Sequence, residues 1–316
     1  MRKNKLILAV LAILTVVLVT MQSCKKEEIE LTNDKEKNYA NKKSRSTEQF
    51  EDINGISVKL DNSYDFGEKS ISEWLYFETR NDYMNAIDQL SLGADSAMNS
   101  FESALSFSSM RVSKTEEERE SINIEDDLLA TLLNNDGRIR IGEHIFQIDA
   151  SNDTLLVYSA NGVERVKGFS TDDDVFDILD GIDIEDRHRG CAAKNKIKNV
   201  YFNGSYIDFK VVYQKAGIYF SLLSKISKNT FNGPNTLELN CRGFSISDNY
   251  YVKNKETKAN QINSCYKSGN GKYYQYRPYQ GIRKLNRFHF STYFNVRDDV
   301  YHNELGTFSL RIDCGV

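Results

Sequence analysis

The stretch IDFKVVYQKAGIYFSLLSKI at residues 207–226 decides the fold class of the C-terminal part of the chain. Apolar residues occupy every second position from Ile207 to Tyr213 and again from Ile218 to Ile226, with an interruption at Ser224. Successive side chains of a strand point to opposite faces of a sheet, so this period of two predicts two half-buried strands.

The same alternation continues to the C-terminus. Apolar faces run through residues 237–241, 288–296 and 308–314, and turns that contain Gly and Asn separate them. About seven or eight short strands of this kind are typical of a β-sandwich. We therefore expect residues 191–316 to form an all-β sandwich domain.

Residues 51–190 combine two periods. Residues 124–133 predict a short helix that the turn at 134–137 ends, and from residue 139 onward the period becomes two, with Asn161-Gly162 placed as in a hairpin. We expect an α+β domain in which helices precede a small β-meander. The first helical face is predicted by the spacing of Trp74, Phe77, Tyr83, Ile87 and Leu90.

The first residues have the layout of a secretory signal. A basic head precedes an apolar run of about 14 residues from Leu6 to Val19, which is too short to span a bilayer comfortably. Cys24 follows at the position where a lipoprotein signal peptidase cuts. We expect removal of residues 1–23 and lipidation of Cys24, and the alternatives are a plain secretory signal or an uncleaved membrane anchor.

The residues after Cys24 resemble the surface-export signal of Bacteroidota lipoproteins, in which a lysine and two acids follow the lipidated cysteine. Here they are Lys25, Lys26, Glu27 and Glu28. The resemblance implies an outer-membrane protein that faces the cell exterior, with the periplasmic face as the alternative. Residues 24–50 carry scarcely any apolar group and predict a flexible tether, or else a solvated helix.

A second resemblance covers residues 70–150. The segments 75–83, 101–109 and 132–142 resemble a layout that recurs in a family of uncharacterised Bacteroidota surface lipoproteins. This resemblance implies a location at the cell surface and no known activity.

Charge and motifs limit the classes of function. Loss of the three basic residues in the signal takes the net charge from −4 to −7, and an acidic chain does not follow a phosphate backbone. The sequence contains no G-x-S-x-G, H-E-x-x-H or P-loop pattern. We assign no catalytic residue, metal ligand, cofactor or nucleic-acid partner, and we favour a binding or structural role over an enzyme.

Acidic residues crowd the segment 172–186. Carboxylates can supply oxygen ligands to calcium, but Phe176 occupies the first position of the EF-hand pattern. We interpret the segment as a solvated connection between domains, with calcium binding as the alternative.

Four cysteines lie in the C-terminal part of the chain, at Cys191, Cys241, Cys265 and Cys314. Outside the cytoplasm an even set predicts two disulfides, and all three pairings stay open. Free buried thiols are the alternative.

Tyrosines gather near the end of the chain, and Tyr273, Tyr274, Tyr276 and Tyr279 are candidate ligand-binding residues. A tyrosine ring offers a flat apolar face and a hydroxyl, which suits a sugar or a protein hot spot. The alternative is an aromatic edge hairpin that covers the sandwich. The sequence therefore predicts a lipid-anchored surface component that binds a glycan or protein or supports the envelope. A glycan-degrading enzyme or glycan-binding accessory protein is the alternative function.

Overall fold

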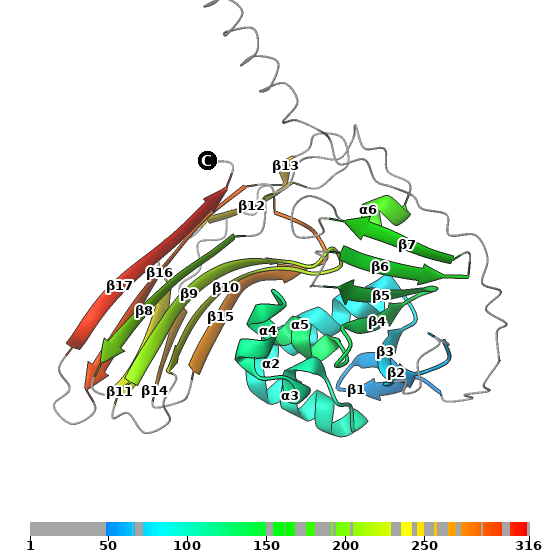
Figure 1. The fold of residues 1–316 in the computed structure, drawn as a ribbon, viewed down its shortest axis with the longest axis horizontal. Helices are drawn as coiled ribbons and strands as arrows, with labels where there is room; N and C mark the ends of the chain where they lie inside the picture. The colour runs from blue at the N-terminus through cyan, green and yellow to red at the C-terminus, as the bar shows by residue number, and fades with distance from the viewer. Residues whose placement is uncertain are drawn as a thin grey trace, which may run out of the picture. The chain divides into compact units, whose positions relative to one another are not determined.

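A computed structural model describes residues 49–64, 66, 72–149, 154–160, 162–167, 175–180, 191, 194–202, 205–228, 235–241, 245–249, 256–257, 265–269, 273–285, 287–298 and 304–314. The described residues all belong to one compact unit. The described part is a mixed α/β fold with few helices and mostly strands in three sheets (Figure 1). None of the described helices is long and apolar enough to cross a membrane.

The first sheet has seven strands in sequence order. They are β1 (Glu51–Ile53), β2 (Ile56–Asp61), β3 (Trp74–Phe77), β4 (Arg138–Ile141), β5 (His144–Asp149), β6 (Thr154–Ser159) and β7 (Gly162–Lys167). Neighbours pair antiparallel except β3 and β4, which run parallel. A parallel pair needs a long crossover, and this one contains α2 (Arg80–Leu105), α3 (Met110–Ser113), α4 (Glu116–Ser121) and α5 (Asp127–Leu132).

The helix that was predicted to start near Trp74 begins at Arg80. Trp74 and Phe77 lie in β3, so this part of the prediction is wrong. The Thr79 side chain accepts a hydrogen bond from the Asp82 N–H at 3.1 Å, and Asp82 Oδ2 accepts one from the Thr79 N–H at 3.0 Å. This capping box fixes the first helical turn, and the aromatic run before it forms a strand, the structure that aromatic residues favour.

Strands also precede the helices, which the sequence analysis did not foresee. The hairpin between β1 and β2 turns at Asn54 and Gly55, whose φ angles are 55° and 85°. Two residues with positive φ form the tight turn that matches the twist of paired strands. The later hairpins, β4 with β5 and β6 with β7, pair as predicted.

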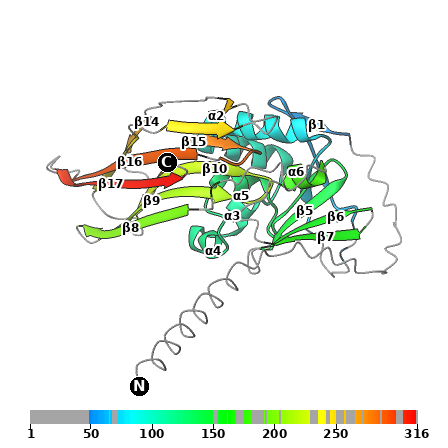
Figure 2. The same ribbon diagram turned by 90° about the horizontal axis from the view of Figure 1, so that it is seen from above.

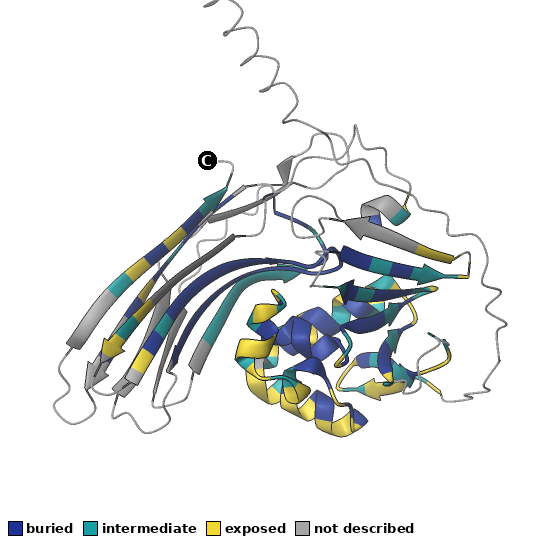
Figure 3. Cartoon of the chain, in the orientation of Figure 1, coloured by how far each residue is buried: buried dark blue, intermediate teal, exposed yellow. Residues whose placement is uncertain are grey.

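One core lies between this sheet and the helices. Tyr83, Ile87 and Leu90 on α2 are buried in it, as the helical spacing predicts. Figure 3 shows the same helices exposed on their opposite side. The C-terminal part of the chain also contributes, through Ala216, Ile218, Tyr219 and Ile282.

The other face of the sheet carries cations between aromatic rings. Lys59 Nζ lies 4.9 Å from the ring centroid of Phe50 and 5.0 Å from that of Tyr76. The Arg140 guanidinium lies 4.2 Å from the Tyr76 centroid and donates to Asp61 at 2.7 Å. These contacts fix the charged ends of Lys59 and Arg140, and the aliphatic parts of both side chains lie along the strands.

Two further sheets make up the C-terminal part (Figures 1 and 2). One has the strand order β15 (Tyr273–Gly281), β10 (Phe220–Lys228), β9 (Ser205–Lys215), β8 (Lys194–Phe202). The other has the order β13 (Glu256–Thr257), β12 (Ser245–Asn249), β16 (Arg287–Asp298), β11 (Asn235–Cys241), β14 (Cys265–Gly269), with β17 (Glu304–Cys314) also paired to β16.

A second core lies between these two sheets. The predicted alternation on β9 is confirmed, because Ile207, Phe209, Val211 and Tyr213 are all buried in this core. Phe288, Phe290, Phe294 and Val296 of β16 and Leu310 and Ile312 of β17 pack with them.

The opposite face of β9 and β10 is polar and also buried, because α4 and the segment leading to α5 cover it. Lys225 pairs with Glu116 at 2.6 Å, and Lys210 pairs with Glu120. The Gln214 side chain accepts from the Glu125 N–H at 3.0 Å. The alternation therefore separates an apolar core from a polar interface between parts of the same chain.

Asp126 is the centre of this interface and is fully buried. Its carboxylate accepts hydrogen bonds from the Leu128 N–H, from the hydroxyls of Tyr219 and Ser221, and from Arg277 through Nε and Nη2 at 2.6–2.9 Å. Burial raises the pKa of Asp126, but the Arg277 charge and these hydrogen bonds outweigh it and leave the pKa below its ordinary value. One carboxylate thus joins α5, β10 and β15.

A β-bulge aims Arg277 at this carboxylate. Leu222 pairs with Tyr279 and Ser224 with Tyr276, so Arg277 and Pro278 together oppose a single residue. Proline has no N–H to donate to a ladder, and a bulge is one of the few places in a sheet that accepts it. Tyr276 and Tyr279 consequently both pack against the second core, although they are three residues apart.

The buried pair makes Asp126→Asn a severe substitution. We expect the free energy of unfolding to fall by about 3–5 kcal/mol, because the variant leaves the Arg277 charge buried without a counterion. Urea denaturation measures this, with Asp313→Asn as a control in the exposed ion pair with Arg311 at 2.7 Å. The control should lose less than about 1 kcal/mol.

The same effect has a defined pH dependence. Because the folded-state pKa of Asp126 lies below its unfolded value, its contribution is complete above about pH 4 and declines as the pH falls through the folded-state pKa. The stability difference between wild type and variant should therefore shrink only in acid. Equal stabilities at pH 7 would contradict the central role of Asp126.

Two of the four C-terminal cysteines are joined. Cys191 and Cys314 form a disulfide with their Cα atoms 5.8 Å apart, which links a position three residues before β8 to the last residue of β17. Cys241 of β11 and Cys265 of β14 are direct partners in the antiparallel register. The Cα atoms of such partners lie about 4.5–5.5 Å apart, within the range that a disulfide spans.

We therefore expect a second disulfide between Cys241 and Cys265. Peptide mapping of the non-reduced chain should recover two cross-linked peptide pairs, 191 with 314 and 241 with 265, and Cys24 in neither. Reduction of the sample before digestion is the control and should release all four peptides. Free thiols at Cys241 and Cys265, or any crossed pair, would refute the pairing.

Candidate functional site

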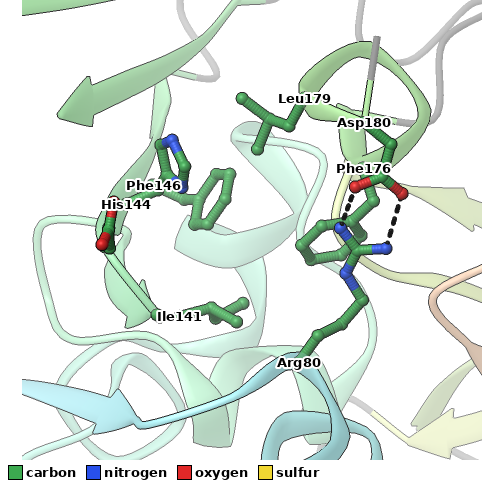
Figure 4. A pocket seen from close by; sticks show the side chains of 9 residues that line it. Arg80, Ile141, His144, Phe146, Phe176, Leu179 and Asp180 are labelled. Atoms are coloured by element: carbon green, nitrogen blue, oxygen red, sulfur yellow. Dashed lines mark hydrogen bonds and ion pairs between the residues drawn. The ribbon is translucent and has the colours of Figure 1, made fainter. Parts of the chain in front are cut away.

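A pocket of about 300 Å³ opens at one edge of the first core (Figure 4). It lies where the start of α2, the turn between β4 and β5, and α6 (Val175–Leu179) meet. Its lining consists of Arg80, Ile141, Gly142, Glu143, His144, Phe146, Phe176, Leu179 and Asp180.

The turn between β4 and β5 forms one wall. Gly142 has a φ of 61°, a conformation that favours glycine, and its N–H donates to the Phe77 carbonyl at 2.9 Å. The next residues continue into β5, where His144 and Phe146 lie on the pocket side (Figure 4). Phe146 is buried and His144 is half-buried, so this wall is apolar toward the core and polar toward solvent.

The opposite wall is α6, and Arg80 fastens it. The Arg80 guanidinium donates to both oxygens of Asp180, at 2.9 and 2.8 Å, and lies 4.3 Å from the centroid of the Phe176 ring. The hydrogen bonds from Arg80 lower the pKa of Asp180, against a smaller effect of burial. Phe176 meets Phe146 edge to face with centroids 5.8 Å apart, which closes the floor.

This arrangement suits a small ligand with an apolar body and few polar atoms. The volume equals that of about ten water molecules in the liquid. Four apolar side chains form part of the lining, while Glu143, His144 and the Arg80–Asp180 pair supply charged and hydrogen-bonding groups. The described lining contains one imidazole and no serine, threonine or cysteine.

None of the sequence-predicted site residues lines this pocket; some lie in other parts of the fold, and others lie outside the described residues. Cys24 and Lys25–Glu28 lie outside the described residues, as does most of the acidic segment 172–186. Tyr276 and Tyr279 pack against the second core, and the Tyr279 hydroxyl donates to the Arg283 carbonyl. Tyr273 and Tyr274 belong to β15 by their backbone, and their side chains are outside the description.

Sequence reasoning missed the pocket because its walls lie far apart in the chain. Arg80 and Asp180 are separated by 100 positions. The one available signal was Asp180 within the acidic segment, where it pairs with an arginine. His144 was one of only four histidines, but nothing in its neighbourhood indicated a pocket.

Comparisons with known proteins add little. No protein-family model matches the chain, and no curated protein matches it. Among solved structures, a DUF4848 family protein from Bacteroides thetaiotaomicron VPI-5482 aligns at 12% identity, with 81% of this chain and 100% of that chain covered and a TM-score of 0.21. A superposition this loose carries no argument about the fold or function of the chain.

The anchoring of α6 can be measured by a double-mutant cycle on Arg80 and Asp180. We expect a coupling energy of about 0.5–1 kcal/mol from Arg80→Ala, Asp180→Ala and the double variant, because the pair is bidentate but partly exposed. The control cycle uses Arg311 and Asp313, an exposed pair within β17 at 2.7 Å. A coupling no larger than that of the control would show that the ion pair does not fasten α6.

Proposed function

We propose that the chain is a lipid-anchored lipoprotein of the bacterial outer membrane that faces the cell exterior and acts as a binding or structural component. The observation that carries the proposal is the order of basic head, apolar run and Cys24, followed at once by Lys25–Glu28. Two acyl chains on one cysteine anchor a protein stably to a membrane, since each buried CH₂ contributes about 0.8 kcal/mol.

The fold supports a binding role. We propose that residues 51–190 form an α+β domain and residues 191–316 a β-sandwich domain, in a family of uncharacterised Bacteroidota surface lipoproteins. The polar interface around Asp126 and the core residues supplied by Ile218 and Tyr219 hold the two together. A rigid body of this kind presents its pocket in a fixed geometry, which lowers the entropic cost of binding.

A glycan-binding accessory function is the second candidate. The observation that favours it is the exposed pair Tyr201 and Tyr206 on the four-stranded sheet. A role in glycan degradation has no comparable support among the described residues.

Proteinase shaving of intact cells tests the location. We expect the wild-type folded part to be removed from the surface, while a variant with Lys25–Glu28 replaced by alanine is protected, because the variant lacks the export signal but keeps Cys24. Disrupted outer membranes are the control and should expose both proteins. Protection of the wild type on intact cells would place it on the periplasmic side, and release of a Cys24→Ser variant into the soluble fraction would check the anchor separately.

A further inference from the structure

One face of the four-stranded sheet continues beyond the helices that cover its other end. On β9, Lys210 and Gln214 lie on this face, against Glu120 and Glu125. Tyr206 and Asp208 occupy the same face toward the start of the strand, since side chains alternate and the register has no break. There the burial falls, and Tyr206 is 52% exposed.

The antiparallel register arranges this end of the face in rows across the strands. The outer row pairs Tyr201 of β8 with Tyr206 of β9. The next row runs through Asn199, Asp208, Ser227 and the backbone position of Tyr273. The third row contains Lys210, Lys225 and Gln275, and its lysines contact acidic residues of the helices that cover the sheet.

The outer row presents two aromatic rings to solvent. Tyr201 and Tyr206 are 58% and 52% exposed, and their ring centroids lie 5.0 Å apart with the planes at 59°. Tyrosines in direct cross-strand contact support each other's orientation. They therefore present two preorganised apolar ring faces, tilted against each other, and each ring carries a hydroxyl. We call this pair the tyrosine platform.

The second row adds planar polar groups beside the platform. Asn199 Nδ2 donates to Asp208 Oδ1 at 2.5 Å, which fixes both side chains. An amide and a carboxylate held in this way still have one carbonyl oxygen, one amide hydrogen and one carboxylate oxygen for a ligand. Hydroxyl groups of a sugar both donate and accept, so they match such a set.

The charges on this face select against anionic ligands. The cations of the third row are already neutralised, Lys210 by Glu120 and Lys225 by Glu116. Asp208 adds a negative charge next to the platform, and the mature chain is acidic overall. A phosphate backbone, an anionic membrane or an acidic polysaccharide would meet repulsion here.

We propose that the face formed by Tyr201, Tyr206, Asn199 and Asp208 binds a neutral carbohydrate chain. Sugar rings would lie on the tyrosine platform through their apolar C–H faces, while Asn199 and Asp208 exchange hydrogen bonds with the ring hydroxyls. The inference deepens the proposed binding role and rests on it for access to extracellular glycans.

Affinity electrophoresis of the lipidated full chain, in a nonionic detergent without a sugar headgroup, tests the proposal. Native gels contain soluble starch, barley β-glucan or galactomannan as neutral polysaccharides, and polygalacturonate as an acidic one. We expect retardation by at least one neutral polysaccharide and none by polygalacturonate. Tyr201→Ala and Tyr206→Ala should each weaken the retardation at least tenfold, and Asn199→Ala should weaken it less.

Tyr293→Ala is the matched control. Tyr293 is a tyrosine 44% exposed on β16, in the other C-terminal sheet, and its loss should leave retardation unchanged. Urea denaturation should find all four variants fully folded under the conditions of the gel, because the substitutions are on the surface.

Three results would overturn the proposal: no retardation by any neutral polysaccharide, equal loss in Tyr293→Ala, or a dimer that dissociates in the Tyr201 and Tyr206 variants without any glycan effect. The last result would assign the platform to a second copy of the chain. Shaving of the same variants keeps the tests separate, because a surface-exposed wild type without retardation refutes only the glycan site. A shielded wild type with retardation refutes only the location.

Discussion

The buried carboxylate of Asp126 is the constraint on which the rest of the structure depends. It caps α5 through the Leu128 N–H and binds Tyr219, Ser221 and Arg277 from the C-terminal part of the chain. A buried charge is tolerated only when a counterion and hydrogen bonds replace the water it has lost. Because Asp126 meets this condition only with all its partners in place, it fixes the helices, β10 and the bulged strand β15 relative to one another.

The connection between β9 and β10 carries this constraint to the pocket. Tyr219 reaches Asp126 from here, and Ile218 fills the first core. The Gly217 carbonyl, one position earlier, accepts from the Val175 N–H at the start of α6. The start of α6, which forms one wall of the pocket, is therefore hydrogen-bonded to the same connection that Asp126 positions. The residue after α6, Asp180, is held by its ion pair with Arg80.

The four-stranded sheet thus serves different purposes along its length. Its inner face contributes residues of β9 and β10 to the second core, with Val200, Tyr276 and Tyr279 packed against them. Its outer face joins the helices where Lys210, Gln214 and Lys225 meet acidic or polar partners, and presents the Tyr201–Tyr206 platform where the helices end. One alternating pattern builds all three surfaces, because a strand exposes a different set of side chains to each side.

The sequence by itself determined the local elements: the alternation through residues 207–213 and 220–226, the later hairpins and the helical face of α2, each set by neighbours within a few positions. It wrongly placed Ile218 on the same strand face, because Ile218 lies in the connection before β10 and packs in the first core. The lipoprotein signal at Cys24 is likewise read from neighbouring residues and stays a prediction. The sequence misplaced the start of α2 because the capping box at Thr79 outweighs the apolar spacing before it. Only the tertiary structure decided that the polar face of β9 is buried, that Tyr276 and Tyr279 belong to a core, and that Arg80 meets Asp180. These features depend on contacts between residues up to about 150 positions apart, such as Asp126 and Arg277. A local sequence pattern does not show which distant residues pack against a given face.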